Sequence, residues 1–206
     1  MADDNLVIGL ALVAVIVSAV GLGFSYYNQA GITGFAQYND TGIVNITIDA
    51  NLAIRFVSPT YDIIDWGNGT VDTGSPFAIL ETPGGTVTNG SWIPVAHGFI
   101  IENIGNIPAN LSVVVENNAS DLLGGDNPVY QFNWTENESG SCHNGSMANS
   151  TWFDVNKTVK GSLLCQTFLT DDATDEVRLD VRLYVPSNSY TGTRTDTVTA
   201  IADTDW

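Results

Sequence analysis

The residues able to perform acid–base, nucleophilic or metal chemistry are few and scattered in this chain of 206 residues. The two histidines, His97 and His143, lie in no motif that would make a neighbouring serine a nucleophile. The zinc-protease, hydrolase-elbow, phosphate-loop and dinucleotide-binding patterns do not occur either. We therefore expect no enzyme activity, no catalytic residue and no cofactor.

Asparagine carries the most frequent chemical motif of the sequence, the acceptor pattern Asn-X-Ser/Thr for N-linked glycans. Eleven of the nineteen asparagines begin such a sequon. This enrichment predicts an exported, glycosylated surface, although polar loops rich in Asn and Thr also generate sequons. Asn45 and Asn110 fall within or beside predicted strands, where burial can block them. The sequon asparagines are Asn39, Asn45, Asn68, Asn89, Asn110, Asn118, Asn133, Asn137, Asn144, Asn149 and Asn156.

The only two cysteines, Cys142 and Cys165, predict one disulfide if the domain is exported. A zinc site would use the adjacent His143, but the paired ligand spacing of zinc sites is missing. The acidic run from Asp171 to Glu176 offers oxygen ligands for calcium without the spacing and central glycine of an EF-hand loop. We expect a solvated loop there, and no metal site.

The N-terminal segment contains no charged residue between Asp4 and Asp40. Leu6 to Phe24 is a run of nineteen positions with nothing more polar than Ser18. As a helix this run would be roughly 28 Å long, close to the hydrocarbon thickness of a bilayer. The sequence therefore predicts a long hydrophobic helix over residues 1–30. A cleaved signal, a single-pass anchor, a core helix and a helix that leaves the membrane to pack against its own copies are the alternatives.

The pattern of small and large residues favours the last of these alternatives. Small side chains let helices approach closely, and apolar side chains at heptad spacing interdigitate. Ser25 continues the stripe of small residues. The predicted helix-packing residues are the small Ala11, Ala14, Ser18 and Gly21 and the larger Leu6, Leu10, Val13, Val17, Val20 and Phe24.

Beyond residue 40 the pattern changes to the period-two alternation of β-strands. The clearest example is Glu176–Val185, in which every second residue is Val or Leu. The predicted fold class is α+β, with a long N-terminal hydrophobic helix (1–30), a hinge (31–40) and an all-β immunoglobulin-like sandwich domain (41–206). Weaker alternation predicts further strands at Ile43–Ile48, Leu52–Val57, Phe99–Ile104, Leu111–Glu116, Leu163–Leu169 and Thr195–Ile201.

The charge balance excludes several partners. With 23 acidic and six basic residues, the formal net charge is −17. Such a surface repels nucleic-acid phosphates and anionic lipid headgroups. The same charge, together with glycans, would keep closely packed copies hydrated.

A short polar N-terminus, the helix LVIGLALVAVIVSAVGLGF and a sequon-rich β domain resemble archaeal type IV pilins and archaellins. The resemblance implies a subunit that is held in the membrane by its N-terminal helix and then moves into a filament with a helical core. Family precursors carry a basic leader, whereas no Lys or Arg precedes Leu6, so the chain either is already mature or is processed differently. Phe99–Asn106 and Leu111–Val115 also resemble β-sandwich modules of archaeal surface proteins, including strand-exchanging fibre subunits.

We therefore expect a structural subunit of an extracellular filament of the pilus or archaellum type, used for adhesion or motility. Its partners would be copies of itself, the membrane before assembly, and N-linked glycans, with no nucleic acid. The main alternative is a single-pass, membrane-anchored surface glycoprotein that binds a partner and does not polymerise. A third is a strand-exchange fibre, in which residues near Gly31–Ile48 pair with another subunit.

Overall fold

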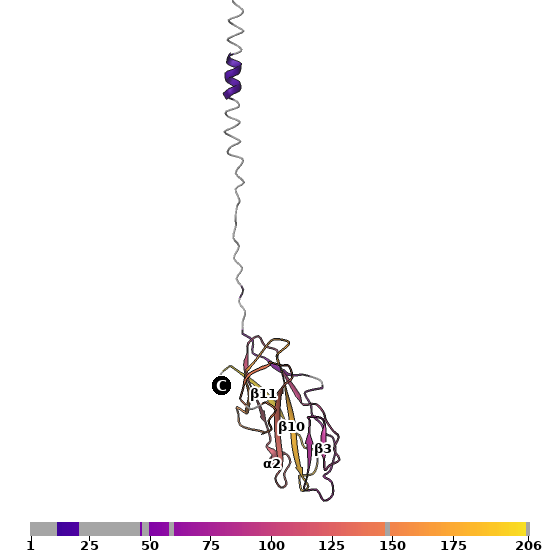
Figure 1. Cartoon of the computed structure of the whole chain (residues 1–206). Coiled ribbons are helices and arrows are strands. Elements are labelled where there is room, and N and C mark those ends of the chain that lie inside the picture. The colour runs from indigo at the N-terminus through magenta and orange to yellow at the C-terminus, as the bar shows by residue number, and fades with distance from the viewer. Residues whose placement is uncertain (1–11, 21–45, 47–49, 58–59, 147–148, 205–206) are drawn as a thin grey trace, which may run out of the picture. The chain divides into compact units, whose positions relative to one another are not determined.

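The computed structural model describes residues 12–20, 46, 50–57, 60–146 and 149–204. The chain divides into two units, residues 1–47 and residues 48–206. In the first unit, residues 12–20 form an α-helix with every residue exposed. In the second unit, the described residues form eleven strands in two sheets around one hydrophobic core (Figure 1).

The prediction of an α+β fold with a long N-terminal helix is wrong, because the fold is mainly β and the described helix has nine residues. Such a helix is about 13 Å long. Within the described ranges, no helix has the length and apolar character needed to span a bilayer. All nine side chains of this helix are exposed, so packing within the chain adds nothing to its stability. The rest of the predicted helix and the predicted hinge lie outside the described residues.

The larger sheet is antiparallel and branches at its longest strand, β10 (Glu176–Pro186). On one edge β10 pairs with β6 (Val129–Glu136), which in turn pairs with β8 (Phe153–Asp154). The other edge is shared by two strands, which extend the sheet outward. These are β4 (Phe99–Asn103), followed by β1 (Ile54–Phe56), and β2 (Phe77–Glu81), followed by β3 (Thr86–Thr88).

The smaller sheet has four strands and carries the disulfide. Its order is β11 (Val198–Asp203), β5 (Ala109–Val115), β9 (Ser162–Phe168) and β7 (Cys142–Gly145), all antiparallel. The short helix α2 (Ala119–Leu122) follows β5. The predicted sandwich of two sheets is therefore present, but its branched order differs from immunoglobulin domains, which divide seven to nine strands over two sheets.

Side-chain alternation explains why β10 lies at the centre of the unit. Its Val and Leu residues are buried, from 0 to 8% exposed, as the alternation predicted. They pack with Phe132 and Ile101 of the same sheet and with Leu111 and Phe168 of the other. Burial of each such side chain contributes about 1.5–3 kcal/mol.

The other predicted strands had mixed outcomes. Those at 52–57, 99–104, 111–116, 163–169 and 195–201 overlap β1, β4, β5, β9 and β11. Strands β2, β3, β6, β7 and β8 were missed. Of the predicted strand Ile43–Ile48, the structure describes only Ile46, which is not in a strand and is 80% exposed.

Thr82, directly after β2, is hydrogen-bonded to the part of β10 that lies between its two partners on the shared edge. Strand β4 pairs with residues 176–179 of β10 and β2 with residues 182–186, so Asp180 and Val181 lie between them. The backbone N–H of Thr82 donates to the carbonyl of Val181 (3.0 Å), and its Oγ1 accepts from the N–H of Val181 (3.0 Å). The same hydroxyl donates to Oδ1 of the buried Asp180 at 2.7 Å. The Thr82 hydroxyl therefore hydrogen-bonds to two groups of β10, the N–H of Val181 and the carboxylate of Asp180, at positions that pair with neither β4 nor β2.

We expect Thr82→Val, which removes only the hydroxyl function, to lower the free energy of unfolding by about 1–3 kcal/mol, because the N–H of Val181 is left buried without its acceptor. Urea unfolding followed by tryptophan fluorescence measures the change. Thr82→Ser keeps the hydroxyl and serves as the matched control, with a clearly smaller loss. Equal losses in the two variants would contradict the role given to this hydroxyl.

Candidate functional site

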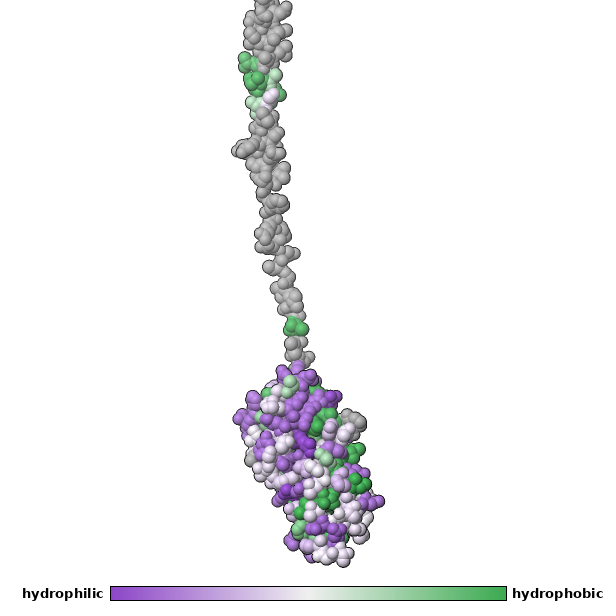
Figure 2. Space-filling model, turned by 45° about the vertical axis from the view of Figure 1, so that its right-hand side comes forward, coloured by the Kyte–Doolittle hydropathy of each residue, from purple (hydrophilic) through white to green (hydrophobic). Residues whose placement is uncertain are grey.

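The helix at residues 12–20 exposes apolar side chains along its whole length. Its side chains are mostly green in Figure 2, the colour of high hydropathy. A shallow groove on it is lined by Ala14, Val15, Ser18 and Ala19. The large side chains are 54–67% exposed, namely Leu12, Val13, Val15, Ile16, Val17 and Val20.

Ala14 and Ser18 are two of the three small residues of this groove, and they lie on one helix face because they are four residues apart. The hydroxyl of Ser18 donates to the carbonyl of Ala14 at 2.8 Å. The one side-chain polar group on the helix therefore has a partner within the helix, and burying it in an apolar contact leaves no unsatisfied donor. Of the predicted packing residues, Leu6, Leu10, Ala11, Gly21 and Phe24 lie outside the described residues.

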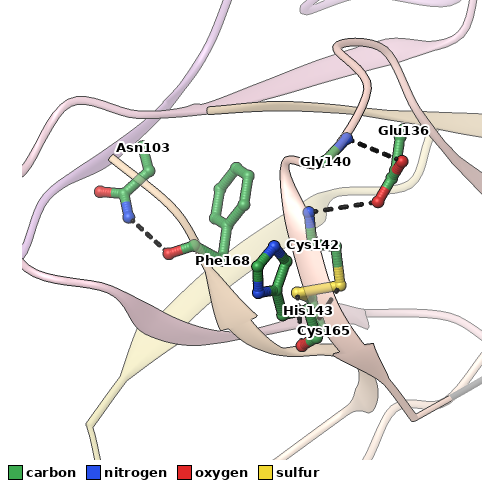
Figure 3. Close-up of a disulfide and its surroundings, with 7 residues drawn as sticks. All are labelled: Asn103, Glu136, Gly140, Cys142, His143, Cys165 and Phe168. Carbon is green, nitrogen blue, oxygen red and sulfur yellow. Dashed lines mark hydrogen bonds between the residues drawn. A yellow bond between two sulfur atoms is a disulfide. The ribbon is translucent and has the colours of Figure 1, made fainter. Parts of the chain in front are cut away.

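The predicted disulfide is present and fixes an edge strand to the core. Cys142 at the start of β7 is bonded to the fully buried Cys165 of β9, with their Cα atoms 5.7 Å apart (Figure 3). The carboxylate of Glu136 accepts from the N–H groups of Gly140 (3.0 Å) and Cys142 (3.4 Å), which fixes the turn into β7. Closing a loop of this length stabilises a domain by roughly 3 kcal/mol.

The sequon asparagines differ in how far they are exposed to solvent. Asn39 and Asn45 lie outside the described residues. Buried Asn133 on β6 is 9% exposed. Asn110, Asn118 and Asn156 are half-buried. The exposed ones are Asn68, Asn89, Asn137, Asn144 and Asn149.

Hydrogen bonds of the side-chain amide nitrogen, the atom that carries an N-linked glycan, divide these residues further. Nδ2 of Asn137 donates to Glu176 at 2.6 Å, and Nδ2 of Asn156 donates to the carbonyl of Gly161 at 3.1 Å. A glycan at either position would replace one of the two hydrogens of an amide nitrogen that already donates within the folded chain. Sequence reasoning missed these hydrogen bonds, since the acceptor is 39 residues away in one case and a backbone carbonyl in the other.

Two exposed sequons, 68–70 and 89–91, are held together in one hairpin-like pair. The hydroxyls of their last residues, Thr70 and Ser91, are hydrogen-bonded at 3.2 Å. Their middle residues, Gly69 and Gly90, lie against the ring of Trp92, where an added Cβ would come within 2.3 and 2.8 Å of ring atoms. Both middle positions therefore require glycine, a signal that the repeated Asn-Gly-Ser/Thr pattern carries in the sequence.

We expect Asn133 to be unmodified in the native protein, because the fold covers its side chain opposite Asp180 of β10. Intact-mass measurement should show no change for Asn133→Gln beyond that of the substitution. Asn89→Gln, at an exposed sequon, is the matched control and should remove the mass of one glycan. A glycan found on Asn133 would contradict this assignment.

The candidates for metal or acid–base chemistry remain dispersed. His143 is exposed on β7, and half-buried His97 makes an edge-to-face contact with Tyr61. Among the described residues, no group of three or more His, Cys, Asp or Glu side chains could hold a metal ion. The acidic run begins as an exposed loop, in which Asp171 Oδ1 accepts from the N–H of Ala173.

Asp175 differs from the predicted solvated loop, because it is only 6% exposed. Its N–H donates to Glu138 Oε2 at 2.9 Å. Burial, and then the neighbouring charges of Glu138 and Glu102, raise the pKa of Asp175 to about 6. Sequence reasoning missed this pair of carboxyl groups, since Glu138 is 37 residues away.

A raised pKa makes the folded state bind a proton more tightly than the unfolded state does. Stability from Asp175 is therefore fully present below about pH 4 and is lost as the pH rises through about 6. We expect Asp175→Asn to raise the free energy of unfolding by about 1–2 kcal/mol at pH 7.5 and to have little effect at pH 4. Denaturant unfolding at both pH values tests this, with exposed Asp72→Asn as the control. The same change at both pH values would refute it.

Comparison with known proteins adds no assignment, because no family model matches the chain and neither does any curated protein or solved structure. The arguments for function therefore depend on the residues and contacts described above.

Proposed function

We propose that this protein is the structural subunit of an extracellular, glycosylated filament. Copies assemble through the apolar N-terminal segment, residues 6–24, and the β unit forms the outer surface for adhesion or motility. The observation that carries the proposal is the helix at residues 12–20, which exposes apolar side chains on all sides.

The energetic argument concerns water. Removing each large aliphatic side chain from water contributes about 1.5–3 kcal/mol, so the six on this helix contribute on the order of 10 kcal/mol per subunit. No charged residue between Asp4 and Asp40 opposes that burial. The segment therefore has a strong tendency to leave water, either for lipid or for other protein.

The shape of the helix favours other copies as the final surroundings. Ala14 and Ser18 line the shallow groove together with Val15 and Ala19, while Val13 and Val17 form a neighbouring row with the same four-residue spacing. A ridge and a groove on one helix are complementary to the groove and ridge of a second copy. The resemblance of the N-terminal residues to archaeal type IV pilins and archaellins supports the same arrangement.

Export is supported by the β unit. It contains a disulfide, which persists in oxidising surroundings, and five exposed sequon asparagines. The formal net charge of −17 keeps neighbouring outer domains hydrated and opposes their aggregation. We place the subunit in the membrane before assembly and in the extracellular filament afterwards.

A second candidate is a membrane-anchored surface glycoprotein that does not polymerise. The observation that favours it is the absence of a polar face on the described helix, which suits lipid on every side. The two candidates differ in the state of the native protein, since only the first gives filaments of uniform width in electron microscopy.

We expect Ala14→Arg or Ser18→Arg to abolish filaments while the β unit stays folded, because a buried unpaired charge is costly. Ala14→Leu separates helix packing from membrane insertion. It keeps the segment apolar and fills the groove, so filaments should be lost while membrane insertion is kept.

Electron microscopy of cell-surface material and membrane fractionation measure the two outcomes. Thr86→Arg, at an exposed position of β3, is the control for a new surface arginine and should leave filaments intact. Normal filaments from Ala14→Leu would contradict helix packing. Membrane-bound protein with no filament from the unmodified chain would favour the second candidate.

A further inference from the structure

A shallow hollow of about 280 Å³ lies beside α2 in the β unit. Its lining comes from the start of α2, from β6 and from β8. The residues that matter are Asn118, Ser120, Val129, Tyr130, Asp154 and Val155. Four of these six side chains carry a polar group, while Val129 and Val155 supply apolar surface.

The polar groups of this hollow are held in place by neighbours. Asp154 Oδ1 accepts from Nε2 of Gln131 at 3.0 Å, which orients its carboxylate. Tyr130 is 5% exposed, and burial and the nearby Asp196 raise the pKa of its phenol well above the usual value. The phenol therefore stays neutral, and the only charge that the lining side chains present is the carboxylate of Asp154.

Asn118 both lines the hollow and begins a sequon, Asn118-Ala119-Ser120. Its Oδ1 accepts from the N–H of Asp121 and from the hydroxyl of Ser120, both at 2.8 Å. These bonds cap α2 and fix the orientation of the amide, so Nδ2 is the remaining polar atom of the side chain. In contrast to Asn137 and Asn156, no described residue accepts a hydrogen bond from it.

We infer that Asn118 carries an N-linked glycan and that the innermost sugar of this glycan lies in the hollow. This inference depends on the exported glycoprotein of the proposed function. The apolar face of the sugar ring packs on Val129 and Val155, and Asp154 accepts hydrogen bonds from its hydroxyls. The occupant is thus a part of the same molecule, tethered by the residue that lines its own site.

The chemistry leaves the helix cap in place. A polyprenyl-phosphate-linked oligosaccharide is the donor class. Its bond from sugar C1 to the phosphate oxygen breaks, and a bond from C1 to Nδ2 of Asn118 forms. Nδ2 loses one of its two protons, and the polyprenyl phosphate leaves with that proton, with no change in oxidation state. Because Oδ1 is untouched, both of its hydrogen bonds remain.

Glycopeptide mass spectrometry of the native protein tests the attachment. Cleavage after Glu116 and after Tyr130 separates Asn118 from Asn133. We expect a glycan on Asn118 and none on Asn133. If Asn89 is glycosylated and Asn118 is not, this inference is wrong and the proposed function stands. If no sequon is glycosylated, the glycoprotein surface in the proposed function fails as well.

Hydrogen exchange tests the position of the sugar. Ser120→Ala destroys the sequon but keeps the bond from Asp121 to Asn118, while Ser120→Thr keeps the sequon. We expect the amides of residues 122–124 and 129–130 to exchange several-fold faster in Ser120→Ala than in Ser120→Thr. The two variants should match when they are produced without glycosylation. Equal exchange in the glycosylating host would show that the sugar lies outside the hollow.

Discussion

Strand β10 is the element on which the rest of the β unit depends. It pairs with β6 along one edge and with both β4 and β2 along the other, while its inward side chains fill the core between the sheets. Strands β1, β3 and β8 join the larger sheet only through these partners. Thr82 hydrogen-bonds to Asp180 and Val181, the two residues of β10 that lie between the segments paired with β4 and with β2. The period-two pattern of one strand therefore determines the position of most of a sheet.

The two units of the chain differ in how their apolar side chains are covered. The β unit buries a core of apolar residues, although Ile63, Ile93 and Val159 are exposed, and the face seen in Figure 2 mixes hydrophilic areas with apolar patches. The helix at residues 12–20 leaves its apolar side chains exposed. Hydrophobic burial is roughly proportional to area, so this helix stabilises nothing until another apolar surface covers it. This division is the basis of our proposal that the chain acts through assembly, with membrane anchoring as the second candidate.

The sequence predicted those parts of the fold that are local. Alternation identified β10, β4 and β5, and the cysteine count predicted the disulfide, because each signal lies within a few residues or in a single pair. The prediction of a long N-terminal helix was wrong, since an apolar run predicts a tendency to leave water and not the length of the helix, which has nine described residues. Three-residue β3 is too short to show a period, while β6 does alternate Tyr130, Phe132 and Trp134, a signal that was available.

The candidate sites were predicted as residue types and not as environments. The sequence singled out only Asn45 and Asn110 among the eleven sequons, yet the fold buries Asn133, engages the amide nitrogen of Asn137 and places Asn118 in the lining of a hollow. Asp175 looks like one more loop acid, and only sheet pairing brings it to Glu138. In each case the deciding neighbour is distant in the chain, so its effect depends on strand order. In this β unit, the strand pairings that build the core therefore also determine which neighbours surround each asparagine and carboxylate.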